Sequence, residues 1–133
     1  MKAFIAYRST GEDPQAVEPV LIAIREAFKG RGIEAYSTFF DEAIEGKSLG
    51  VRQIMEHAFG IIDNADFLFV VQTSDNKSEG MLIEVGYCMA KRVPIIAATK
   101  DTVTKTYVPA IASQSFKWST IEDLARAITD LQL

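Results

Sequence analysis

Two kinds of apolar pattern alternate along this chain. Short continuous runs, such as the one over residues 66–71, are typical of strands that are covered on both faces of a parallel sheet. Between them, apolar residues recur at intervals of three and four, which is typical of amphipathic helices. The runs predict strands at residues 3–7, 33–37, 66–71, 93–99 and 115–118. The periodic stretches predict helices at residues 17–28, 51–62, 79–91, 107–112 and 120–131.

Helix boundaries and loops support this order of elements. Gly30 and Gly32 follow the first periodic stretch, where a helix is expected to stop, and Thr120 with Asp123 resembles a capping box. Residues 38–49 carry a mixed signal, with two aromatic residues and an acidic run that includes Glu45 before Gly46. We expect this segment to be a loop or a short helix that lies over the functional site.

Strands that alternate with helices at this spacing predict a parallel sheet with right-handed crossover connections. The expected fold class is therefore α/β, a three-layer αβα sandwich with a five-stranded parallel sheet of the flavodoxin or Rossmann-like kind. Residues 1–133 contain no internal repeat or linker, so we expect a single domain.

Composition narrows the function classes. The 133 residues are 48% hydrophobic, which is typical of a globular domain with a real core. A net charge of −4 argues against binding to a nucleic acid polymer. No apolar run approaches the length of a membrane span, and the N-terminal run is interrupted too early, by Arg8, for a signal peptide. Cys88 is the only cysteine, so we expect a cytoplasmic protein without internal disulfides.

Glu84 is the first candidate for a catalytic group. It lies in the helix that follows the apolar strand at 66–71, at the edge of the sheet where ligands bind in α/β proteins. Its neighbours in sequence are mostly apolar, and a partly desolvated carboxylate can act as nucleophile or base. The alternative is a solvent-facing glutamate that only interacts with the helix dipole.

The loop after the first strand is the second candidate region. Four consecutive residues there can hold a phosphate, although the same residue types also form ordinary turns: Arg8, Ser9, Thr10 and Gly11. Tyr7 precedes this loop and either packs or hydrogen-bonds to Glu84. Asp66 leads into the central strand and either caps the loop there or contacts a ribose hydroxyl.

Several signatures are absent from the sequence. There is no GxGxxG, Walker, HExxH or Gly-x-Ser-x-Gly pattern. This argues against a Rossmann-type redox enzyme, a P-loop NTPase, a zinc protease and an α/β-hydrolase with a serine nucleophile. We therefore expect neither a metal ion nor a cofactor.

The block from Ser78 to Tyr87, together with the first strand and its Ser/Thr/Gly loop, resembles the nucleoside 2-deoxyribosyltransferase superfamily. That group includes the 2'-deoxynucleoside 5'-monophosphate N-hydrolases. The resemblance implies that Glu84 is the nucleophile that attacks the anomeric carbon of a nucleoside or nucleotide. It also implies that Ser78, six residues earlier, binds a 5'-phosphate, as the serine of the hydrolases does. Gly80 at the helix start would add backbone donors for the same anion.

Two positions depart from the family pattern. The tyrosine of the first strand would fall at Phe4, with Tyr7 as the nearest hydroxyl, and the aspartate that serves the leaving base would fall at Ala58. His57 is adjacent to that position, and it either takes part in proton transfer to the base or is a residue of the helix surface.

The opening strand also resembles that of TIR domains, whose helix glutamate splits the nicotinamide N-glycosidic bond of NAD. Two alternatives to the deoxyribosyltransferase function thus stay open: a TIR-like NAD-cleaving or signalling domain, and a nucleotide-binding module without catalysis. The superfamily resemblance further implies a homodimer or a higher homo-oligomer.

Overall fold

The computed structural model describes residues 1–44 and 47–133. Glu45 and Gly46, part of the segment expected over the site, lie outside the described residues. The elements follow one another as β1 (Lys2–Ala6), α1 (Pro14–Lys29), β2 (Glu34–Tyr36), the 3-10 helix η1 (Thr38–Phe40), α2 (Val51–Ile62), β3 (Phe67–Gln72), α3 (Glu79–Lys91), β4 (Ile95–Lys100), α4 (Val108–Ile111), β5 (Gln114–Trp118) and α5 (Ile121–Thr129).

The described strands form one parallel sheet of five strands in the order β2-β1-β3-β4-β5. This arrangement confirms the predicted α/β class and sandwich. The chain moves outward in one direction from β1 to β2 and in the other direction from β3 to β5. The direction reverses between β1 and β3, so the crevice at their carboxyl ends is the expected ligand site.

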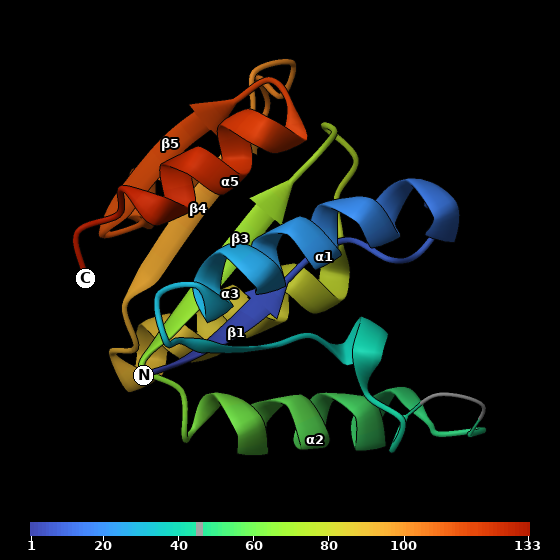
Figure 1. Ribbon diagram of the computed structural model, residues 1–133. Helices are drawn as coiled ribbons and strands as arrows, with labels where there is room; N and C mark the ends of the chain where they lie inside the picture. The colour runs from blue at the N-terminus through green and yellow to red at the C-terminus, as the bar shows by residue number, and fades with distance from the viewer. Residues whose placement is uncertain (45–46) are drawn as a thin grey trace.

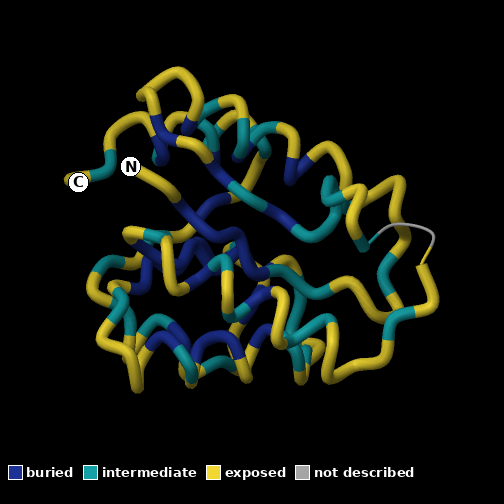
Figure 2. The backbone as a smooth tube through the Cα atoms, turned by 90° about the horizontal axis from the view of Figure 1, so that it is seen from below, coloured by how far each residue is buried: buried dark blue, intermediate teal, exposed yellow. Residues whose placement is uncertain are grey.

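Helices cover both faces of the sheet (Figure 1). Helices α1 and α5 lie side by side on one face, and their apolar residues form one core with alternate residues of the strands, among them Ile5, Phe69 and Trp118. Helices α2, α3 and α4 contribute to a second core on the other face, with Phe4 and Leu68. Strand β3 is buried along its whole length, and the buried residues run through the middle of the molecule (Figure 2).

Local signals explain the helix ends. Pro14 begins α1 behind the N-cap Asp13, whose carboxylate accepts a hydrogen bond from the backbone of Gln15. Gly32 then turns the chain toward β2 with φ +72°, a conformation that glycine adopts without strain. The predicted capping box of α5 is present, because Thr120 and Asp123 each accept a hydrogen bond from the other's backbone.

No helix among the described residues is both long enough and apolar enough to cross a membrane.

Candidate functional site

A cleft of about 580 Å³ lies at the carboxyl ends of the strands, beside the β1–β3 crevice. It is bounded by the loop after β1, by η1 and by the first turns of α2 and α3. Many of the candidate residues lie in its wall: Tyr7, Arg8, Ser9, Thr10, Ser78, Gly80 and Glu84. The structure thus brings together residues that are more than 70 positions apart in the sequence.

Glu84 is the buried acid of this cleft. It lies in the second turn of α3, and only 8% of its surface is exposed. Burial raises the pKa of its carboxyl group from 4.5 to about 8, since the charged form loses hydration. The group is therefore mostly protonated at neutral pH, and its carboxylate becomes available at higher pH or when a positive charge approaches.

Tyr7 follows β1 directly and lies within the electrostatic reach of Glu84. Burial raises the pKa of its phenol, and the hydroxyl of Thr38 lowers it in part. The charge of Glu84 raises that pKa further. The ring of Tyr7 also packs edge-on against Phe39, with 6.3 Å between centroids. Tyr7 is thus a neutral hydroxyl that is held at the wall of the cleft.

Arg8 is fixed by contacts within the loop region. Its guanidinium forms an ion pair with Glu12, and its Nε donates to the carbonyl of Lys77 at 3.2 Å. Gly11 has φ +77° and lies under the guanidinium, where an added Cβ would come to 3.2 Å from Nη2. Gly11 does not line the cleft, so its place in the structure is to let the loop pass close to Arg8.

Ser78 and Gly80 stand at the start of α3. Ser78 is the N-cap residue, and its Oγ accepts a hydrogen bond from the backbone of Met81 at 3.2 Å. Its hydroxyl hydrogen remains able to donate to an anion in the cleft. The helix start adds backbone N–H groups and the positive end of the helix dipole, which together favour a phosphate or carboxylate.

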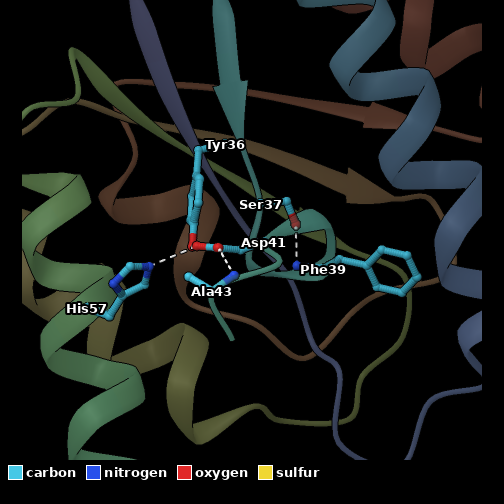
Figure 3. Close-up of polar contacts among 6 residues, drawn as sticks. All are labelled: Tyr36, Ser37, Phe39, Asp41, Ala43 and His57. Carbon is cyan, nitrogen blue, oxygen red and sulfur yellow. Dashed lines mark hydrogen bonds and ion pairs between the residues drawn. The ribbon is translucent and has the colours of Figure 1, made fainter. Parts of the chain in front are cut away.

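Next to the cleft, Asp41 joins two side chains from different elements (Figure 3). Its Oδ2 accepts a hydrogen bond from the Tyr36 hydroxyl and lies 2.8 Å from Nε2 of His57. Two hydrogen bonds hold the pKa of Asp41 below its usual range. The larger effect comes from Tyr36 and the smaller one from His57. Burial raises the pKa of Tyr36 most, and the hydrogen bond to Asp41 raises it further. The charge of Glu84 acts in the same direction, so this phenol stays protonated.

His57 does not enter the cleft. Its side chain is 39% exposed on α2, and its polar contact is with Asp41. The structure thus does not place His57 where the sequence-based prediction of proton transfer to the base needs it, and its hydrogen bond goes to Asp41. The adjacent Ala58 faces the core and is buried, so the helix turns His57 away from that direction.

Asp66 is also outside the site. It directly precedes β3, and its Oδ2 accepts a hydrogen bond from the backbone N–H of Lys2 at 2.7 Å. Both residues lie at the amino ends of parallel strands, the edge of the sheet opposite the start of α3. Asp66 therefore ties β1 to β3 and does not reach a substrate beside Glu84.

Sequence reasoning missed several residues at or beside the cleft. Thr38 of η1 and Lys77 line it, and Tyr36 and Asp41 adjoin it. The acidic and aromatic character of residues 38–49 was the one available signal, and Thr38 does lie in the cleft wall as expected for a segment over the site. Tyr36 pairs with Phe4 across β1 and β2, and their rings lie 5.3 Å apart. A hydroxyl-bearing ring thus stands beside the position where the family pattern has its tyrosine.

A buried glutamate in the second turn of a helix, in a cleft at the carboxyl edge of a parallel sheet, is an arrangement suited to attack on a sugar carbon. The sequence profile of the nucleoside 2-deoxyribosyltransferase family matches residues 14–120. The chain belongs to this family.

Solved structures with the same fold cover almost the whole chain. A CMP N-glycosidase from Clostridium botulinum has a TM-score of 0.72 and 13% identity, over 96% of this chain and 97% of that one. A 2-deoxyribosyltransferase from Bacillus psychrosaccharolyticus also has a TM-score of 0.72, with 14% identity over 99% and 93% of the two chains. A conserved protein from Enterococcus faecalis V583 has a TM-score of 0.67 and 18% identity, over 96% of each chain. A search of curated protein sequences found no match.

Proposed function

We propose that this protein cleaves or transfers the N-glycosidic bond of a nucleoside or a (deoxy)nucleoside 5'-monophosphate, with Glu84 as the nucleophile. The observation that carries the proposal is the buried carboxyl group of Glu84 in the cleft beside the start of α3. Family membership and the two enzymes named above, which act on CMP or transfer deoxyribose, support the same substrate class.

In the proposed reaction, an oxygen of the Glu84 carboxylate attacks the anomeric carbon of the sugar. A glycosyl ester forms, the bond from that carbon to the base nitrogen breaks, and the base takes the electron pair and a proton from solvent. Water or the nitrogen of a second base then attacks the same carbon and loses a proton to solvent. The ester bond breaks, which restores the carboxylate and leaves the sugar bonded to the water oxygen or to the second base. Water gives hydrolysis and a base gives transfer.

The cleft supplies complementary groups for the rest of the substrate. The Ser78 hydroxyl and the amide of Gly80 stand where a 5'-phosphate would meet the dipole of α3. Ser9 and Thr10 offer further hydroxyls from the first loop, and Arg8 offers a charge that Glu12 already compensates in part. Tyr7 stands near Glu84 as a neutral hydrogen-bond donor for the carboxylate or for a ribose hydroxyl.

We further propose that the chain acts as a homo-oligomer. Exposed apolar side chains gather on α3, α4 and the residue before α4, around a groove of about 810 Å³: Leu82, Tyr107 and Ile111. Tyr107 is 90% exposed, which is unusual for so large a ring. A second copy that covers this groove would also stand beside the helix that carries Glu84. The cytoplasm is the compartment we propose, because the single cysteine, Cys88, is buried and free.

The direct test is a screen for base release. The purified chain is incubated with nucleosides, their 2'-deoxy forms, the corresponding 5'-monophosphates and NAD, and free bases are separated by chromatography. Base release from a nucleoside or monophosphate, and its loss in Glu84→Gln, is the expected result. Nicotinamide release from NAD alone would favour the TIR-like alternative, and binding without turnover would favour a nucleotide-binding module. Either outcome overturns the proposal.

A further inference from the structure

A second cavity, of about 390 Å³, opens at the carboxyl edge of the sheet on the face that α1 and α5 cover. Its apolar wall includes Val17, Val20 and Val71, which belong to or pack against the core of that face. Glu84, Ser78 and Gly80 are not part of its lining. The cavity is therefore separate from the cleft described above, although Tyr7 and Arg8 stand in the walls of both.

The charged side chains that line this cavity carry a net positive charge. Arg8 and Lys100 contribute two cationic groups, and Glu12 contributes one carboxylate, which is already paired with Arg8. Lys100 forms no ion pair with any described residue. Its Nζ lies 5.7 Å from the centre of the Trp118 ring, within the range of a cation–π contact. In a chain of net charge −4, this is a local site that favours an anion.

Trp118 is one of the residues that line the cavity, and it is 4% exposed. Its Nε1–H is buried, and it has no hydrogen-bond acceptor anywhere in residues 1–44 and 47–133. Among the side chains of those residues, it is the one fully buried nitrogen or oxygen without a partner. This N–H is closed off from the cavity, so the face of the indole ring, over which Lys100 lies, is the part of Trp118 that bears on a ligand.

We propose that this cavity is a second ligand site, which binds a small organic anion with an apolar or aromatic body. The carboxylate or phosphate oxygens of the ligand neutralise Lys100, whose Nζ lies beside the Trp118 ring. The valine side chains of α1 and β3 enclose the body of the ligand. The volume falls within the range of small-molecule sites, and the mixture of apolar walls with a few polar groups is typical of them. The proposal does not depend on the reaction assigned to Glu84.

The chain offers a specific probe, because Trp118 is its only tryptophan. In a ¹H–¹⁵N correlation spectrum of the labelled full chain, the indole N–H of Trp118 gives a signal of its own. We would titrate sodium benzoate and phenyl phosphate, with benzyl alcohol as a neutral control of similar shape. The expected result is a saturable shift of the indole signal with at least one anion, at about millimolar affinity or better for so small a ligand. The more tightly bound anion identifies the charged group that the site prefers.

Three variants locate the binding. Lys100→Met should weaken it about tenfold, since a charge-assisted contact is lost. Lys117→Met removes an exposed lysine from the same region and should leave the affinity unchanged. Glu84→Gln should also leave it unchanged, because Glu84 lies outside this cavity. The proposal is overturned if neither anion shifts the signal, if benzyl alcohol binds as well as the anions, or if Glu84→Gln removes the binding.

Discussion

His57 Nε2 lies 2.8 Å from Oδ2 of Asp41, the same oxygen that accepts the hydrogen bond of the Tyr36 hydroxyl. This carboxylate thereby connects α2 with the end of β2. The segment between Tyr36 and Asp41 contains Thr38, which lines the cleft. The contact between His57 and Asp41 therefore fixes one wall of the cleft from the outside.

His57→Ala should weaken substrate binding without a dependence on the leaving base. The loss of one hydrogen bond to a charged group corresponds to roughly 1.5–3 kcal/mol, of which only part reaches the substrate. We expect KM to rise severalfold for substrates with good and with poor leaving bases alike, and His57→Gln to restore part of the loss. Glu56→Ala, which breaks only the exposed ion pair with Arg52 on the same helix, should have no effect. A selective loss with poor leaving bases would instead show that His57 takes part in proton transfer.

The activity should rise with pH as Glu84 ionises. The nucleophilic form is the carboxylate, and its pKa in the free protein is about 8. We expect kcat/KM to increase up to about tenfold per pH unit below that pKa and to level off above it. Rates measured from about pH 5 to pH 9.5 would test this. A profile that is flat or falls between pH 6 and pH 8 would contradict a buried carboxylate nucleophile.

Glu84→Gln should abolish base release and also change the pH dependence of stability. The folded-state pKa of about 8 lies above the model-compound value of 4.5, so the folded protein holds this proton more tightly than the unfolded chain does. The resulting stabilisation is complete below pH 4.5 and is lost as the pH rises through about 8. The free energy of unfolding of the wild type should therefore fall, relative to that of Glu84→Gln, by on the order of a few kcal/mol across this pH range.

Denaturant unfolding of both proteins at several pH values measures this difference. Glu18→Gln, at an exposed position of α1, is the matched control and should follow the wild type. Parallel stability curves for wild type and Glu84→Gln would mean that the carboxyl group is hydrated in solution.

Ser78→Ala should reduce the use of monophosphates by about tenfold to a hundredfold, since a hydrogen bond to a charged group is lost. Ser78→Asp should lower the kcat/KM for monophosphates further and leave the kcat/KM for free nucleosides nearly unchanged. The quantity to measure is the ratio of the kcat/KM values for monophosphate and nucleoside.

Because Ser78 also caps α3, a control for lost capping is required. Thr120→Ala removes the equivalent N-cap of α5, away from the cleft, and should lower stability by about 0.5–2 kcal/mol without a change in that ratio. If the ratio does not move in either Ser78 variant, the serine is a helix cap and does not bind phosphate.

Leu82→Lys should dissociate the proposed homo-oligomer. A charge in the middle of an apolar contact loses hydration without a partner, so association should weaken strongly. Light scattering after gel filtration gives the mass directly. Ile22→Lys changes an exposed isoleucine on α1, on the other side of the sheet, and should leave the mass unchanged. A monomeric wild type would contradict the proposal at once.

The sequence was informative where a local pattern determines the position of a residue. The apolar run of β3 and the periodicity after it placed Glu84 on a helix at the correct edge of the sheet. Asp66 lies away from the cleft because a residue before a strand and a residue after it are at opposite edges of the sheet, and its hydrogen bond to Lys2 agrees with the structural one of its two alternatives. Tyr36 and Asp41 were missed for another reason. Their position depends on the register between β1 and β2 and on the path of the chain after β2, which no local pattern specifies.

Arg8 and Tyr7 stand between the two cavities and contribute to the wall of each. A ligand that draws the Arg8 guanidinium toward one cavity changes the charge that the other cavity presents. Binding at the two places is then linked, and thermodynamics requires the linkage to be equal in both directions. An anion that weakens the affinity for substrate by some factor would itself be bound more weakly, by that same factor, once substrate occupies the cleft.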